Sequence, residues 1–344
     1  MSADLQSYNR QLAQSKQKLV LSIVLLLISS LGALFIGRYP VAGFASPQLL
    51  LSDPLYAQVV LHIRLPRVVL AVVGGAALAA AGYVFQMLFA NPLVEPGFLG
   101  VSQGAAFGAA SAMVFFGSSA ALIQVFAAVG GLVALFLSYL IARLLRFGGS
   151  ILRLVLAGIA VGAFFSALLS LVKLAADPHG SLQEITFWMM GGLYNSNWSM
   201  AVWVVPIIGV SLTLLLLFRW RINILSLSAK SAHAVGLAVG VQKGLLLLCA
   251  TTATTAIISV AGLLGWVGLI IPHLGRKLYG SDARYSLGGS ALLGALFLLL
   301  CDTAGRTLLS SEIPLGVITS LCGAALFVVI LSQKEKEREF EHSL

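Results

Sequence analysis

Long apolar runs recur along the whole chain and are separated by short polar segments. Each clear run is close to the roughly 20 residues that an α-helix needs to cross the hydrocarbon core of a bilayer. Eight runs are clear, and they cover residues 20–36, 68–89, 98–116, 120–145, 154–176, 200–218, 287–301 and 313–331. The pattern therefore predicts an all-α, polytopic membrane protein.

A ninth apolar stretch, residues 244–271, is long for one crossing and is interrupted by Gly262 and Gly265. Basic residues decide how it is divided, because Lys and Arg collect in cytoplasmic loops. Two crossings place most of the 21 Lys and Arg residues on the side of the N-terminus, whereas one crossing moves those of 276–284 to the opposite side. We therefore predict a bundle of ten transmembrane helices with both termini cytoplasmic. The second half, about residues 263–274, should be a short helix shielded by its neighbours.

The composition narrows the class of protein. Of the 344 residues, 59% are hydrophobic and 10% are charged, whereas about a quarter of a soluble domain is charged. This excludes soluble enzymes, disordered regulators and disulfide-stapled secreted domains. The net charge of +9 indicates membrane orientation rather than nucleic-acid binding. We treat residues 1–344 as a single transmembrane domain with a cytoplasmic N-terminal segment (1–18), loop (219–243) and tail (333–344).

No catalytic signature occurs in the sequence. The patterns G-x-x-x-x-G-K-[ST], H-E-x-x-H and G-x-S-x-G are missing, so any ATP hydrolysis belongs to another polypeptide. Asp302 is the acid inside a strong apolar run, and Arg306 one turn later favours a rim ion pair over an ion-coupling site. Cys249, Cys301 and Cys322 are far apart and lack metal-ligand spacing, which favours buried structural cysteines.

Glycines spaced four residues apart occur in two of the predicted spans. Gly100, Gly104 and Gly108 lie in the third span, and Gly158 and Gly162 lie in the fifth. This spacing lets helix backbones approach closely. We favour contacts inside the bundle, with a dimer seam as the alternative.

Four short motifs mark the ends of predicted helices, where proline and glycine are expected to break the helix. They are RLPR at 64–67, NPLVEPG at 91–97, GWVGLIIPH at 265–273 and EIPLGVIT at 312–319. Together and in this order they resemble the permease subunits of ATP-binding-cassette importers for iron-siderophore complexes, haem and vitamin B12. This type II importer family is called FecCD.

The resemblance implies an architecture and a set of partners. It implies ten membrane helices per subunit, a second permease copy or paralogue, two cytoplasmic ATPases that carry ATP and Mg, and an extracytoplasmic substrate-binding protein. It implies no cofactor or metal on this chain and a place in the bacterial inner membrane. A ferric siderophore is the expected substrate, with haem, vitamin B12 or an oxyanion as alternatives. An ion-coupled carrier and a channel or receptor are the competing classes.

The resemblance also assigns two docking residues. Arg64 and Arg306 match positions at the outer rim where family members receive carboxylates of the binding protein, and an unpaired arginine suits that role. The alternatives are that Arg306 pairs with Asp302 and that Arg67 extends to lipid headgroups.

The cytoplasmic loop at 219–243 matches the segment that couples the permease to its ATPase. The family usually has acidic residues in part of this segment, whereas this chain has Ser, Ala, Lys and Ser at 228–231. An ordinary solvated loop is the alternative. The predicted coupling residues are Leu227, Ser228, Ala229, Lys230, Ser231, Ala232, His233, Ala234, Val235, Gly236 and Leu237.

A cytoplasmic gate is the last assignment that the resemblance implies. Asn91, Leu93, Ile151 and Leu152 match family positions at the inner end of the pathway. Ile151 and Leu152 replace small hydroxyl residues of a relative, and an apolar constriction closes by excluding water. Plain packing of helix ends is the alternative for these two residues.

Overall fold

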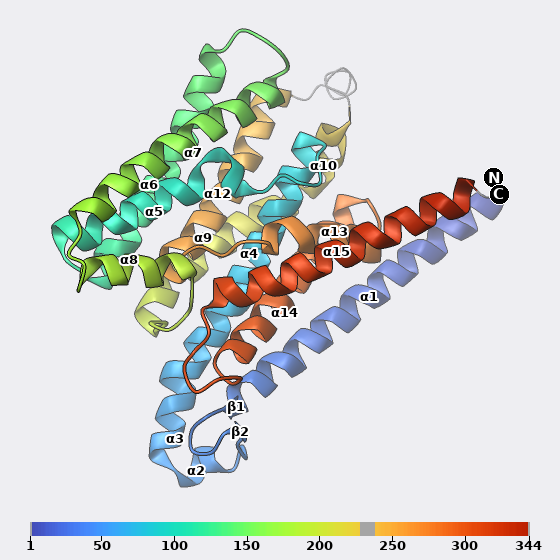
Figure 1. The fold of residues 1–344 in the computed structure, drawn as a ribbon. Helices are drawn as coiled ribbons and strands as arrows, with labels where there is room; N and C mark the ends of the chain where they lie inside the picture. Colours follow the sequence, from blue (N-terminus) through green and yellow to red (C-terminus); the bar gives the residue numbers. More distant parts are fainter. Residues whose placement is uncertain (1, 228–237, 343–344) are drawn as a thin grey trace.

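The computed structural model describes residues 2–227 and 238–342, which form an all-α bundle with one minimal β-hairpin (Figure 1). The hairpin pairs β1 (Ile36–Gly37) with β2 (Gly43–Phe44) in antiparallel register. The helices in chain order are α1 (Ser2–Phe35), α2 (Leu49–Ser52), α3 (Pro54–Gln58), η1 (Val59–Arg64), α4 (Leu65–Phe89), η2 (Pro96–Leu99), α5 (Val101–Ser111), η3 (Ala112–Phe116), α6 (Ala120–Leu144), α7 (Ser150–Ala175), α8 (Ser181–Met190), α9 (Trp198–Leu217), α10 (Arg219–Ser226), α12 (Val239–Ala261), α13 (Val267–Tyr279), α14 (Ala283–Gly305) and α15 (Leu315–His342).

Seven helices of the described residues are long and apolar enough to cross a membrane. Two shorter apolar helices, Val101–Phe116 and Leu315–Ile330, match two further predicted spans. The divided stretch is confirmed as two helices, α12 and α13, although α13 begins at Val267, a few residues later than predicted. The chain is thus a multi-helix membrane protein, and ten crossings remain the prediction for its topology.

The RLPR motif does not break the helix, which corrects the sequence expectation. Helix runs without interruption over Pro54–Phe89, with Pro66 in the first turn of α4. The turn before it, η1, is π-helical, and the Leu65 amide donates to the Val60 carbonyl five residues earlier. A proline lacks the amide of a regular helical bond, and the wider π turn accommodates this change in register.

Helix α4 is the central helix of the bundle. It packs against α9, α12, α13 and α14, and 78% of the apolar window of Pro54–Phe89 is buried. Two contacts are so close that they need glycine. A Cβ at Gly75 would overlap with the Gly294 carbonyl oxygen of α14, and one at Gly82 would overlap with the Gly268 carbonyl oxygen of α13. The α4 backbone therefore lies directly against two neighbouring helices.

The glycines of the third and fifth spans pack inside the subunit, as favoured from the sequence. A Cβ at Gly104 would overlap with the Gly130 carbonyl oxygen, and one at Gly108 with that of Phe126, both on α6. A Cβ at Gly158 of α7 would overlap with the Phe98 carbonyl oxygen. Helices α5, α6 and α7 thus form a tightly packed group that contacts α12 through α5 and α6 (Figure 1).

Helix α1 lies at the edge of the bundle, and only 6% of its apolar window is buried. Near the middle of α1 the Lys18 ammonium donates to the Leu278 carbonyl at 2.8 Å, and the Ser22 and Tyr279 hydroxyls are 2.5 Å apart. The start of α1 and the end of α15 lie at the same end of the bundle (Figure 1), which agrees with termini on one side of the membrane. The hairpin and the short helix α8, which the sequence did not predict, lie toward the opposite end.

Candidate functional site

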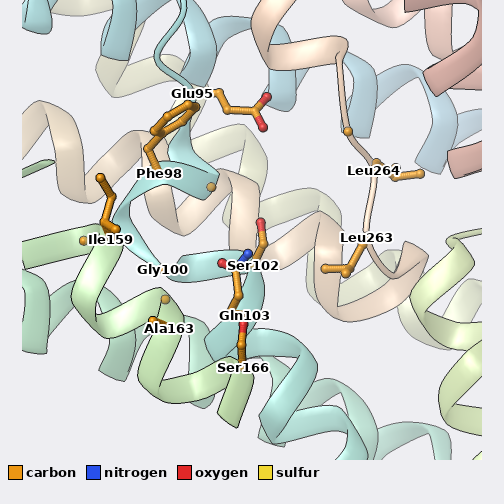
Figure 2. Close-up of a pocket in the computed structure, with 14 residues that line it drawn as sticks. Glu95, Phe98, Gly100, Ser102, Gln103, Ile159, Ala163, Ser166, Leu263 and Leu264 are labelled. Carbon is orange, nitrogen blue, oxygen red and sulfur yellow. The ribbon is translucent and has the colours of Figure 1, made fainter. Parts of the chain in front are cut away.

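A cavity of about 500 Å³ opens between α5, α7 and the loop before α13 (Figure 2). Glycine and alanine positions on α7 leave this space open, because they carry little or no side chain. Its lining residues are Glu95, Gly97, Phe98, Gly100, Ser102, Gln103, Gly158, Ile159, Gly162, Ala163, Ser166, Leu263, Leu264 and Gly265. The lining is mixed, with polar and apolar surface in similar amounts.

Glu95 and Gln103 are the acidic and the amide side chain of this cavity. The Gln103 Oε1 atom is buried and has no hydrogen-bond partner in the described part of the chain. Burial raises the pKa of the Glu95 carboxyl to about 7. Glu95 lies in the NPLVEPG motif between α4 and η2, next to the first turn of α13. The sequence analysis used this motif as a helix end, as a family motif and, through Asn91 and Leu93, as part of the gate, but it missed the carboxyl of Glu95.

We expect the stability of the protein to fall as the pH rises through about 7, because the buried site disfavours the ionised form of the Glu95 carboxyl. Its pKa is raised on folding, so the folded state binds the proton more tightly, and stability is highest at low pH. The Glu95→Gln variant should lose this dependence and be more stable than the parent above pH 7. Thermal midpoints in detergent from pH 5 to 9 measure this effect, with Glu184→Gln at an exposed carboxyl as the control. Parallel pH profiles of the parent and Glu95→Gln would contradict it.

Of the four predicted gate residues, Asn91 and Leu93 lie on the connection after α4, and Ile151 and Leu152 lie in the first turn of α7. The Asn91 side chain accepts a hydrogen bond from the Leu93 amide at 2.9 Å, which shapes the turn after α4. Leu93 and Leu152 are exposed, and Ile151 packs against an apolar cluster that includes Leu88. The structure therefore leaves the gate assignment as a prediction, with Ile151 engaged in helix packing.

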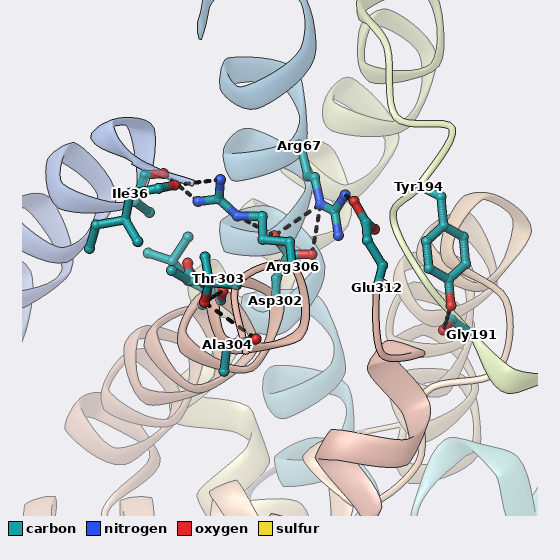
Figure 3. Close-up of polar contacts among 12 residues, drawn as sticks. Ile36, Arg67, Gly191, Tyr194, Asp302, Thr303, Ala304, Arg306 and Glu312 are labelled. Carbon is teal, nitrogen blue, oxygen red and sulfur yellow. Dashed lines mark hydrogen bonds and ion pairs between the residues drawn. The ribbon is translucent and has the colours of Figure 1, made fainter. Parts of the chain in front are cut away.

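A network of charged side chains, all buried except Glu312, joins α4, α14 and the segment before α15 (Figure 3). The Arg67 guanidinium donates to Asp302 at 2.9 Å and to Glu312 at 2.9 Å. Asp302 is 1% exposed, and Arg306 Nε lies 3.8 Å from its second oxygen. In each Arg67 contact one guanidinium nitrogen faces both oxygens of a carboxylate, and charge-assisted hydrogen bonds of this kind are stronger than neutral ones. Arg67 thus does not reach lipid headgroups, and the RLPR and EIPLGVIT motifs meet in one cluster.

Both predicted docking arginines are buried and engaged. Arg64 donates to the Leu34 carbonyl at 2.9 Å and to the Tyr39 carbonyl at 2.8 Å. Arg306 donates to the Ile36 carbonyl at 2.8 Å and to the Ala33 carbonyl. The premise of an unpaired guanidinium was wrong, because the C-terminal end of α1 leaves carbonyls without helical partners and the two arginines satisfy them. Binding-protein docking stays a prediction for both.

Only the first residue of the predicted coupling segment is described, and Leu227 is exposed. Residues 228–237, from Ser228 to Leu237, lie outside the described part of the chain. The preceding helix α10 is tied to the start of α14 through Asn223. Its amide donates to Asp282 at 2.7 Å and accepts from the Ala283 amide at 2.8 Å. A shift of α10 would therefore act directly on α14.

Comparison with known proteins decides the family. Residues 23–333 match the model of the FecCD transport family. The chain belongs to the FecCD transport family. It is 38% identical to the molybdate import system permease MolB of Haemophilus influenzae, over 90% of this chain and 93% of that protein. It is 39% identical to a probable iron chelatin transport permease of Helicobacter pylori, over 79% and 82% of the two chains.

A solved structure shows the same fold. It is an inward-facing conformation of a metal-chelate type ABC transporter, with a TM-score of 0.86 and 36% identity over 92% of this chain and 99% of that one. This FecCD chain is therefore a multi-pass permease subunit of an ABC importer and is not itself the catalytic subunit. No group of three or more His, Cys, Asp or Glu residues suited to a metal occurs within 2–227 and 238–342.

Proposed function

We propose that this permease carries an iron chelate, most favourably a ferric siderophore, across the bacterial inner membrane. The observation that carries the proposal is the cavity between α5 and α7, in a fold that matches a metal-chelate type transporter over nearly its whole length. A cavity that presents both apolar surface and hydrogen-bonding groups suits a bulky chelate with polar edges.

The proposed assembly follows from membership of the family. Residues 1–344 act as one permease domain with ten crossings. It pairs with a second copy or a paralogue, with two cytoplasmic ATPases and with an extracytoplasmic binding protein. ATP and Mg are held by the ATPases, and this chain binds no cofactor of its own. The permease supplies the pathway through the membrane and the gates that open and close it.

Coupling is proposed to pass through α10. Closure of the ATPases moves the segment 227–237, and the Asn223–Asp282 contact transfers this movement to α14. The charge cluster of Arg67, Asp302 and Glu312 links α14 in turn to the start of α15. Movement at the cytoplasmic end can thus reach the outer end through packed helices and ion pairs.

Uptake into proteoliposomes tests the proposal. The purified permease is reconstituted with its co-purifying ATPase, and binding protein is added after preloading with ferric siderophore, haem or cobalamin. ATP-dependent accumulation of the ferric siderophore is the expected result. Accumulation of another ligand would reassign the substrate, and transport that persists without ATP would indicate an ion-coupled carrier.

An oxyanion is the second candidate substrate. The observation that favours it is the similarity to the molybdate permease of Haemophilus influenzae over 90% of this chain. Molybdate belongs in the same uptake assay, with its own loaded binding protein. Accumulation of molybdate without accumulation of any chelate would replace the iron proposal.

A further inference from the structure

Two cysteines, one on α14 and one on α15, lie at the contact between these two helices. Gly305 near the end of α14 contacts the first turn of α15, since a Cβ there would lie 3.0 Å from Ile318 Cδ1. The helices run in opposite directions. A step of one turn, back from Gly305 on α14 and forward from Ile318 on α15, therefore brings residue 301 opposite residue 322. Cys301 and Cys322 occupy these positions. The sequence spacing gave no indication of this register.

The side-chain contacts agree with the register. The Cys301 and Cys322 side chains also lie near enough to influence each other electrostatically. Cys301 is buried, whereas Cys322 is exposed on α15, which corrects the expectation that all three cysteines are buried. Cys249 is buried on α12. Cys301 and Cys322 therefore form one thiol pair, and Cys249 is a separate buried thiol on another helix.

We infer that Cys301 and Cys322 form an oxidation-sensitive dithiol that closes to an intramolecular disulfide. A disulfide needs Cβ atoms about 4 Å apart, and the contact between Gly305 and Ile318 one turn away places the two cysteines on facing sides of neighbouring helices. Each thiol loses its proton, the two sulfurs form a bond, and two electrons and two protons pass to a two-electron oxidant such as diamide, whose N=N bond becomes a hydrazine.

The disulfide would fix α15 to α14 beside the charge cluster of Arg67, Asp302 and Glu312. A covalent link removes the sliding of one helix along the other that alternating access requires. This consequence rests on the proposed transport function, whereas formation of the disulfide does not. Oxidation should therefore stop transport in the locked state, and reduction should restore it.

Peptide mapping tests the disulfide on the full-length protein in detergent. Trypsin cleaves after Arg306, so a disulfide joins the peptides 285–306 and 307–334 under non-reducing conditions. We expect diamide to convert most of the protein to the linked form, and dithiothreitol to separate the peptides. The Cys249→Ser variant should behave like the parent, and Cys301→Ser and Cys322→Ser should give no linked peptide.

A trivalent arsenical provides an independent measurement, because it bridges two adjacent thiols and binds single thiols weakly. Phenylarsine oxide should protect Cys301 and Cys322 together from alkylation in the parent and should protect neither remaining thiol in the single variants. Unlinked peptides after diamide, with no protection by the arsenical, would overturn the proposal.

Uptake gives the functional readout. Diamide should abolish most uptake by the parent and by Cys249→Ser, with recovery after dithiothreitol, and should leave Cys322→Ser unaffected. If the disulfide forms and uptake is unchanged, the dithiol stands and the locking of α15 is wrong. If reduced protein shows no uptake of any ligand, the transport proposal fails while the peptide map still decides the disulfide.

Discussion

The Asp302→Asn variant should lose about 3–5 kcal/mol of stability, the range expected when one partner of a buried ion pair is removed. Asp302 is 1% exposed and lies between the guanidinium groups of Arg67 and Arg306. Neutralising it leaves two buried cations with Glu312 as the remaining carboxylate of the cluster. The repulsion between the cations should separate α4 from α14 at the outer end of the bundle.

The thermal midpoint of the purified variant in detergent measures this effect. Glu312→Gln is the matched control, because Glu312 belongs to the same cluster and is 42% exposed. Exposed ion pairs contribute about 0–1 kcal/mol, so the control should shift the midpoint only slightly. Equal midpoints for the two variants would show that the buried Asp302 contributes no more to stability than the exposed Glu312.

The charge cluster shows where sequence reasoning succeeded and where it ended. The spacing of Asp302 and Arg306 predicted an ion pair one helical turn apart, and the structure contains it at 3.8 Å. The shorter contact is to Arg67, 235 residues away. Spacing along one helix identifies local partners, whereas partners on other helices depend on how the helices pack. For the same reason the sequence could not place Arg64 and Arg306 against the end of α1.

The membrane helices were largely predictable, because the bilayer dictates both their length and their composition. Two features fell outside this rule. Pro66 lies within a continuous helix because a π turn precedes it, and α8 is too short and too polar to register as a span. The role of Glu95 was also missed, since its burial arises from α13, which follows about 170 residues later. Local patterns predict elements, and the site depends on their assembly.

The Gly108→Ala variant should destabilise the bundle by about 1–3 kcal/mol, the usual cost of overpacking a close contact. A Cβ at this position would overlap with the Phe126 carbonyl oxygen of α6. Backbone atoms cannot rotate away as a side chain can, so α5 and α6 must separate along their length. The separation should also widen the cavity between α5 and α7, so that the loss of stability is accompanied by a loss of uptake.

Gly209→Ala on α9 is the matched control, because nothing lies within 4 Å of a Cβ there. Alanine has a higher helix propensity than glycine by roughly 1 kcal/mol, so this variant should be as stable as the parent or slightly more stable. Thermal midpoints of the two variants should therefore move in opposite directions. If both rise together, helix propensity outweighs the backbone contact, and the close packing of α5 on α6 would not be what requires glycine at position 108.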